Sequence, residues 1–497
     1  MSEYESPQRR PVNPKKMQPA GSNDIFEKIL TAFAGFVVVA FAVDMAVHAY
    51  QLSHFGGDDI RLLTDARVEP LASALWRSHS DLHFAPLHYL AAHGISWLAP
   101  LRFDVALAVM LSFYLAGAAA LYIVFSRLLP RPWAALMIAW YGVNGCLAVQ
   151  FLWWGSAMHR LPYILFTALA VYFYLIFRGD GRWRWAAAVL ASTALGCGFF
   201  VKAVFTPLIL AAVEIAHPTR TEPPVRVRVG VLLLVLTLGC GLWFALSQSQ
   251  IDRQVGVPGA FWIRYVERRS WAVLVESCFG GPFSAATWGV WRWTAIAATA
   301  MTVGWSVRWR IHAGLAWILG GFLVSMSIAA TALGARSMAF LATDSIARYV
   351  FELMPVVCVF AALAFANPVN AAPTDPVGNT DLAARRRRVL CVASMVLITV
   401  LGITSRINSM AMLSRAERSK AARAYLNNLV AGISDVSAGS SGPIAVAEGF
   451  IPKRVLGFSS GERLSELMPL VDSDVRVVPR REAAYVVTPD GRVKKLR

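Results

Sequence analysis

The sequence predicts an all-α polytopic membrane protein with a small C-terminal α/β domain. Of the 497 residues, 57% are hydrophobic and only 15% are charged, whereas soluble proteins carry about 25% charged residues. The apolar residues gather in runs of about 20, the length of a helix that crosses a bilayer. Residues 406–497 instead show short strand-like and helix-like patterns. This composition excludes an ordinary cytosolic enzyme, and the formal charge of +17 is typical of contact with lipid headgroups.

The first predicted span follows a polar N-terminal segment, residues 1–23, that contains four basic residues. The apolar run from Ile25 to Tyr50 is longer than the core of a signal peptide, and no small-residue cleavage site ends it. We therefore predict a retained transmembrane helix with a cytoplasmic N-terminus.

The transmembrane part, residues 24–405, holds about eleven predicted crossings. The segment 185–216 has basic residues at both ends, so the positive-inside rule places both ends on one side of the membrane. It is therefore predicted to be a hairpin of two short helices that turns near Lys202. The other later spans are predicted at 104–126, 133–153, 161–177, 229–249, 291–307, 313–334, 348–366 and 389–405. With this count, every basic cluster between spans falls on the cytoplasmic side.

Three regions then face away from the cytoplasm: a first outer loop, 51–103; a second outer loop, 250–290; and the C-terminal domain, 406–497. In the C-terminal domain, helices are predicted at 421–429 and 462–470, strands at 443–447 and 475–478, and a hairpin at 485–496 around Pro489-Asp490-Gly491. Pro-Asp-Gly is the turn chemistry expected between two short strands.

The sequence gives little support for a cofactor site. The six cysteines form no CxxC pair, and five lie in apolar runs, so neither a disulfide framework nor a zinc framework is predicted. His79, Asp81 and His83 alternate, which would place them on one face of a strand with His88 nearby and would suit a divalent cation. The competing interpretation is that His83 to His88 form a turn that faces substrate. No nucleotide-binding or nucleic-acid motif is present, and no nucleic-acid partner is expected.

The first outer loop is where acid–base chemistry is expected. Gly56-Gly57 precede Asp58 and Asp59 directly after the first span, and the glycines would let the backbone turn the carboxylates towards the membrane. Asp58 and Asp59 are the catalytic candidates, while a solvated turn is the alternative. The same loop supplies further candidates for substrate binding, which are Glu69, Asp81, His83 and His88.

Polar residues at membrane level form a second group of candidates, because buried charge there usually marks a function. His159 and Arg160 are predicted to close the third span, and Lys202 is predicted to lie at the hairpin turn. Arg348 and Tyr349 are predicted to open the tenth span. The second outer loop contains three further arginines, Arg264, Arg268 and Arg269. Outward-facing cations do not follow from the positive-inside rule. Binding of a lipid phosphate or pyrophosphate explains them, and headgroup contact by snorkelling side chains is the alternative.

These features together resemble the GT-C superfamily of multi-pass glycosyltransferases. The resemblance is carried by the acidic pair after the first span, the His83-Phe-Ala-Pro-Leu turn, the Phe-Val-Lys-Ala-Val stretch around Lys202, and Arg348-Tyr349 followed by Pro355. Trp153 to Pro162 and Gly280 to Phe283 are similar to stretches in a group of uncharacterised actinobacterial multi-pass proteins.

The resemblance implies a bacterial plasma-membrane enzyme that moves a sugar from a polyprenyl-phosphate donor to a cell-envelope acceptor outside the cytoplasm. It implies that Asp58 acts as general base with inversion at the sugar, and that Lys202, Arg348 and the arginines of the second outer loop bind the lipid phosphate. The C-terminal domain would orient the acceptor. Two other classes stay open: a flippase of a lipid-linked saccharide, for which paired broken helices would be the sign, and a non-catalytic scaffold of envelope assembly.

Overall fold

A computed structural model of the chain describes residues 23–76, 84–218, 223–249, 260–282, 288–309, 311–334, 343–366, 380–413, 418–440, 442–452, 455, 463–472 and 474–496. The first half contains α1 (Asn23–Leu52), α2 (Gly57–Val68), α3 (Leu71–Ala74), α4 (Pro86–Leu98), α5 (Phe103–Leu128), α6 (Arg131–Gly142), α7 (Leu147–Leu152), α8 (Trp154–Asp180), α9 (Trp183–Phe199), η1 (Val201–Phe205), α10 (Thr206–Ala216) and α11 (Pro223–Ser249). The second half contains α12 (Ala260–Cys278), α13 (Trp288–Trp309), α14 (Ile311–Gly334), α15 (Thr343–Phe351), α16 (Met354–Phe365), α17 (Thr380–Leu413), α18 (Arg418–Ala438), β1 (Ile444–Ala447), α20 (Leu464–Val471), β2 (Val475–Val478), η5 (Arg480–Glu482), β3 (Tyr485–Val487) and β4 (Val493–Lys495).

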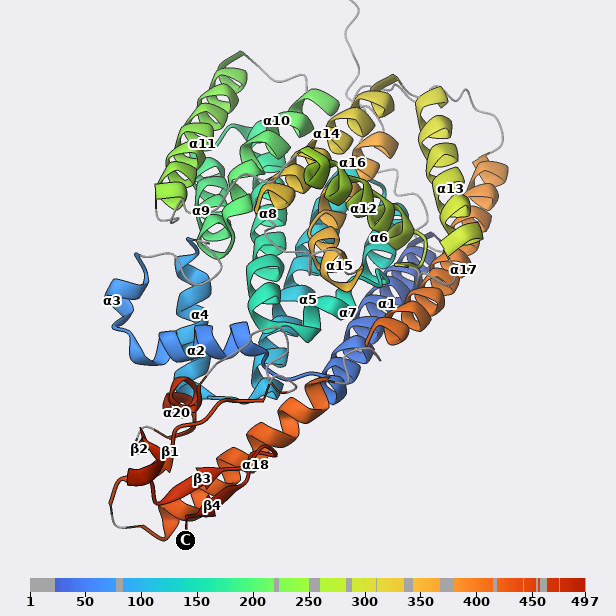
Figure 1. The fold of residues 1–497 in the computed structure, drawn as a ribbon. Helices are drawn as coiled ribbons and strands as arrows, with labels where there is room; N and C mark the ends of the chain where they lie inside the picture. The colour runs from blue at the N-terminus through green and yellow to red at the C-terminus, as the bar shows by residue number, and fades with distance from the viewer. Residues whose placement is uncertain are drawn as a thin grey trace, which may run out of the picture.

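The helices form a membrane-spanning bundle with the C-terminal domain at one end (Figure 1). Within the described residues, seven stretches are long and apolar enough to cross a membrane: Ile25–Leu52, Phe103–Leu128, Trp154–Asp180, Pro223–Ser247, His312–Ala332, Ile346–Phe365 and Arg388–Ala411. The remaining predicted crossings coincide with α6 and α7, with α9 and α10, and with α13, which fall short in length or hydropathy. The polytopic α-helical fold class is confirmed.

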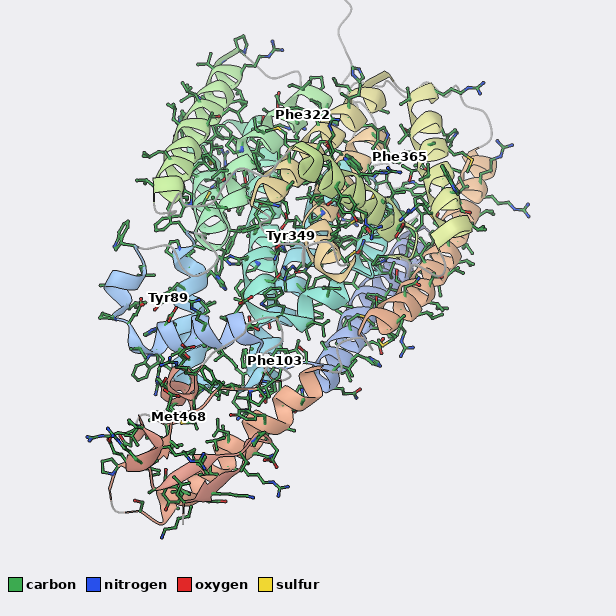
Figure 2. The ribbon with its side chains drawn as sticks, in the orientation of Figure 1. Tyr89, Phe103, Phe322, Tyr349, Phe365 and Met468 are labelled. Carbon is green, nitrogen blue, oxygen red and sulfur yellow. The ribbon has the colours of Figure 1, made fainter. Side chains whose placement is uncertain are left out.

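Side chains in the bundle lie either between helices or on its outer surface (Figure 2). Tyr89, Phe103 and Met468 are buried between elements, whereas Phe322 on α14 is 59% exposed on the outside of the bundle. Large exposed apolar side chains of this kind are expected where a helix faces lipid, because lipid tails replace water there.

Two predicted spans are broken, and a predicted link between two spans is helical. The span 133–153 is two helices, because the chain leaves the helical path at Asn144, whose side chain accepts from Cys146 N and donates to Ser277 O. The stretch 153–160, predicted as an interfacial link, belongs to α8 and is mostly buried inside the bundle. The span 348–366 is interrupted between α15 and α16, where Pro355 in the first turn of α16 has no N–H to donate.

The two short helices and the turn near Lys202 that are predicted in 185–216 are present. Helices α9 and α10 are joined by the short η1 turn that contains Lys202. Close packing from α4 fixes this hairpin, because a Cβ on Gly198 would lie 2.7 Å from the side chain of Leu87. The hairpin therefore brings Lys202 into the interior of the bundle, and Lys202 is only 9% exposed.

The C-terminal domain has the elements that the sequence predicts, and it adds η5 between β2 and β3. Its sheet has the order β2-β1-β3-β4. Strand β1 pairs in parallel with β2 and β3, and β3 pairs antiparallel with β4. The β3–β4 turn contains Gly491, whose φ of +85° lies in the left-handed region that favours glycine.

This domain docks on the first outer loop, and α20 packs against α2. Arg423 of α18 donates to Ser53 O at 2.9 Å, and its guanidinium carbon lies 4.3 Å from the centre of the Tyr50 ring. Next to this contact, burial and the positive charge of Arg423 lower the pKa of His54 to about 4. Further along, Arg406 of α17 donates to the Asp44 carboxylate of α1 at 2.7 Å, so α17 and α18 follow α1 out of the bundle.

Candidate functional site

A buried carboxylate lies at the interruption between α15 and α16. Glu352 is 2% exposed and accepts a hydrogen bond from Arg160 Nε at 2.9 Å. Its other oxygen pairs with the Lys202 ammonium, which also donates to the Thr331 hydroxyl of α14. Charges removed from water are expensive unless they are paired and hydrogen-bonded. Glu352 therefore holds together cations from two other segments of the chain, α8 and η1.

Arg160 is fixed on several sides. It is 4% exposed, and its Nη1 donates to the backbone oxygen of Ser156 at 3.0 Å and to the hydroxyl of the same residue. Its guanidinium carbon lies 4.4 Å from the centre of the Tyr349 ring and 5.5 Å from that of Phe200. A guanidinium between aromatic rings is stabilised by cation–π attraction. The position of the charge is thus determined by the fold.

A third cation, Arg348, lies in the last turn of α15. Its guanidinium carbon is 3.8 Å from the centre of the Trp153 ring, and its Nη2 donates to the Tyr349 hydroxyl at 3.2 Å. Its backbone oxygen accepts from Gln150 Nε2 of α7 at 2.6 Å. Arg348 is half-buried, so this cation lies closer to the surface than Lys202 and Arg160 do.

Two histidines extend the cluster towards the first outer loop. The rings of His88 and His159 have centroids 3.8 Å apart, and His88 also lies 5.7 Å from the Trp154 ring. His159 Nδ1 is 2.8 Å from Phe199 O. Because a carbonyl oxygen can only accept, Nδ1 of a neutral His159 carries the proton and its Nε2 is left as an acceptor.

The two aspartates of the first outer loop have different environments. Asp59 is 1% exposed and accepts from Gly56 N at 3.0 Å and from Gly155 N at 2.8 Å. It thereby joins the start of α2 to the start of α8. Asp58 is exposed at the same helix start. The sequence alone does not distinguish the two aspartates, whereas the structure shows that Asp59 is buried and accepts backbone hydrogen bonds.

The remaining sequence candidates lie around this cluster. Glu69 caps the end of α2, where its N–H donates to Asp65 O. Arg264 and Arg268 are exposed on α12, and Arg269 is half-buried there. Helix α12 packs against α15, the helix that carries Arg348 and Tyr349.

The divalent-cation site predicted in the first outer loop involves His79, Asp81 and His83, which lie outside the described residues. Within the described ranges, no three His, Cys, Asp or Glu side chains converge as metal ligands would.

Sequence reasoning missed Glu352, although a signal was present. It is a lone carboxylate in the apolar stretch Ile346–Phe365, and an ionisable residue in such a stretch points to a buried functional group. Thr331 and Ser156 could not be found in this way, because hydroxyls are common in membrane helices.

Comparison with known proteins gives a fold likeness only. No protein-family model matches the chain, and no curated protein matches it. Among solved structures, a crystal structure of ArnT from Cupriavidus metallidurans bound to undecaprenyl phosphate is similar, with a TM-score of 0.49 and 12% identity over 90% of this chain and 86% of that chain. At that identity, no activity is assigned by the likeness. The chain is a polytopic α-helical membrane protein with a buried cluster of cations around Glu352.

Proposed function

We propose that the chain is an integral membrane glycosyltransferase that uses a polyprenyl-phosphate sugar donor and works on the side of the C-terminal domain. The observation that carries the proposal is the cluster of Arg160, Lys202 and Arg348 with Glu352, at a helix interruption next to the first outer loop. Cations fixed by the fold stabilise a phosphate that gains charge as a leaving group. Guanidinium groups suit its oxygens in particular.

In the proposed reaction, Asp58 acts as general base. The acceptor hydroxyl gives its proton to the Asp58 carboxylate while its oxygen forms a bond to C1 of the sugar. The bond between C1 and the phosphate oxygen breaks, its electron pair stays on the phosphate, and the configuration at C1 inverts. Asp58 fits this role better than Asp59, because Asp58 is exposed and Asp59 accepts two backbone hydrogen bonds.

The proposed topology places the N-terminus in the cytoplasm and the C-terminal domain outside. Contact between α20 and α2 supports a role for this domain in holding the first outer loop over the cation cluster. Arg269 and its neighbours on α12 would contact the lipid phosphate or an incoming headgroup from the second outer loop.

A flippase of a lipid-linked saccharide is the second candidate, and one observation favours it. In the described part of the chain, α6–α7 and α15–α16 are interrupted helices, and Gln150 of α7 donates to Arg348 O of α15. Discontinuous helices that meet near the membrane midplane are common in transporters. Unlike a transferase, a flippase would move the lipid-linked sugar without breaking its bond to phosphate.

The test uses the purified chain in nanodiscs with radiolabelled polyprenyl-phosphate sugars and envelope extract. We expect wild type to transfer label to acceptor, Asp58→Asn to lose transfer by about 100-fold or more, and Asp104→Asn, an exposed carboxylate of α5, to keep it. Transfer by Asp58→Asn at the wild-type rate would exclude Asp58 as base. Movement of intact donor across liposomes, with no cleavage of donor by wild type, would favour the flippase.

A further inference from the structure

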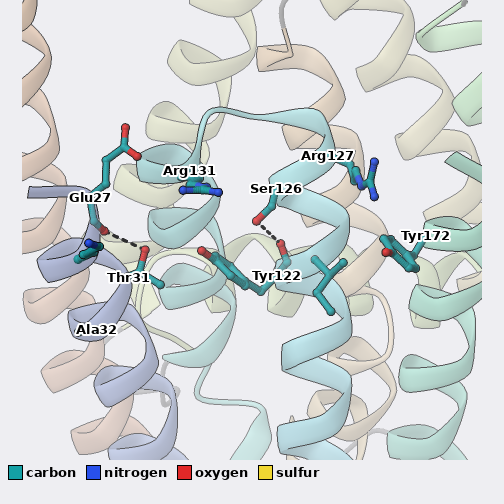
Figure 3. A pocket seen from close by; sticks show the side chains of 10 residues that line it. Glu27, Thr31, Ala32, Tyr122, Ser126, Arg127, Arg131 and Tyr172 are labelled. Carbon is teal, nitrogen blue, oxygen red and sulfur yellow. Dashed lines mark hydrogen bonds between the residues drawn. The ribbon is translucent and has the colours of Figure 1, made fainter. Parts of the chain in front are cut away.

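A cavity lies at the end of the bundle away from the C-terminal domain. It has a volume of about 690 Å³ and opens between the start of α1, the end of α5, the start of α6 and Tyr172 of α8. Figure 3 shows its lining side chains. This end of the bundle is also where α8 ends, whereas the cation cluster around Glu352 involves the start of α8. The two sites are therefore separate.

Positive charge dominates the lining of this cavity. Arg127, Arg131 and Lys28 come from three different helices, and Glu27 is the single carboxylate among the described residues of the lining. In the view of Figure 3, Arg131 and Arg127 lie above Tyr122 and Tyr172, respectively. The guanidinium carbon of Arg127 is 5.6 Å from the centre of the Tyr172 ring. In the part of the chain that the structure describes, neither arginine forms an ion pair. Among the described residues, Arg127 and Arg131 thus give the cavity positive charge that no ion pair neutralises.

Apolar surface continues from this cavity along the outside of the bundle. Ile123 is 42% exposed and Ile29 is 57% exposed, and further down α1 Phe36 is 71% exposed. Positions 25, 29, 32 and 36 fall on one face of α1, because residues three and four apart are neighbours on a helix. A ligand in the cavity would therefore meet cations and phenol groups at one end and a lipid-facing surface at the other.

We propose that this cavity binds the phosphate of an anionic phospholipid headgroup, with the acyl chains along α1 and α5. Arginine pairs well with phosphate oxygens, and tyrosine is common at the headgroup level. Free phosphate would meet the same cations, but it would gain nothing from the apolar face. The proposal is independent of the proposed transferase activity.

The test measures binding of dihexanoyl phosphatidylglycerol, dihexanoyl phosphatidylcholine and inorganic phosphate to the purified full-length chain in detergent. We expect saturable binding of phosphatidylglycerol, weaker by about tenfold or more in Arg127→Gln/Arg131→Gln. The matched control Arg182→Gln/Arg184→Gln removes two charges from the same end but outside the cavity, and it should bind as wild type does.

A gain-of-function variant separates binding from misfolding. Glu27→Gln removes a carboxylate of the lining and should tighten phosphatidylglycerol binding several-fold, with little effect on phosphatidylcholine. Equal losses in the two double variants would show that general surface charge, and not the cavity, attracts the lipid. Equal affinity for inorganic phosphate and phosphatidylglycerol, equal affinity for the two lipids, or unchanged binding in Glu27→Gln would also overturn the proposal.

Discussion

Substitution of Glu352 by glutamine should strongly destabilise the bundle. The carboxylate is 2% exposed and compensates two cations, Arg160 and Lys202, which are 4% and 9% exposed. Removing one partner of a buried ion pair costs about 3–5 kcal/mol, because the remaining charge stays buried without compensation. The glutamine amide oxygen can still accept one hydrogen bond, which recovers about 1 kcal/mol. We therefore expect the free energy of unfolding to fall by about 2–4 kcal/mol.

Unfolding in mixed micelles, followed by tryptophan fluorescence, measures this change. Glu214→Gln is the control, because Glu214 also pairs with an arginine, Arg178, but its side chain is 29% exposed and the atoms are 3.4 Å apart. Arg178 is buried, but it also donates to the backbone oxygen of His217 at 2.8 Å, so it keeps a partner and the control should lose less stability than Glu352→Gln. Lys202→Met in the Glu352→Gln background should restore part of the stability, because it removes one uncompensated charge. A loss in Glu352→Gln no larger than in Glu214→Gln would refute the reasoning.

Three further outcomes are expected. Asp59→Asn should lower the free energy of unfolding by about 1.5–3 kcal/mol, since Asp59 accepts two backbone hydrogen bonds, and equilibrium unfolding in mixed micelles measures this loss. His54 has a native pKa of about 4 against 6.5 unfolded, so its contribution is complete above pH 6.5. About 3 kcal/mol should be lost as the pH falls towards 4, and His54→Phe should remove this dependence in a pH series of unfolding curves. Gly491→Ala should destabilise the C-terminal domain by about 2 kcal/mol, because of its positive φ and the nearby Tyr425 backbone; limited proteolysis of that domain reports it.

The parts of the fold with local chemical signals could be predicted from sequence. The hairpin of the C-terminal domain follows from Pro489-Asp490-Gly491, because these residues favour a tight turn. The turn at Lys202 follows from the charges at the two ends of 185–216, which require an even number of crossings. In both cases the deciding information lies in the segment itself or at its ends.

The helix interruptions and the internal faces could not be predicted in this way. Hydropathy is the same for an apolar side chain that faces lipid and for one that faces another helix, so Trp153 to Arg160 look like an interfacial link, although most of them are buried within α8. The turn at Asn144 depends on a contact with Ser277, far along the chain. Pro355 was visible, but a proline in an apolar run can kink a helix or start one, and only packing decides between these outcomes.

The charge balance around Glu352 gives a physical reason for a carboxylate in a site proposed to bind phosphate. Arg160, Lys202 and Arg348 with one carboxylate leave an excess of two positive charges. A donor phosphodiester carries about one negative charge, whereas a released phosphomonoester carries about 1.5–2 at neutral pH. The site would therefore attract the phosphate more strongly as its bond to the sugar breaks, which is the differential binding that accelerates a reaction. Without Glu352, the third positive charge would stabilise the donor and the released lipid phosphate further, and so would raise affinity without the same gain in rate.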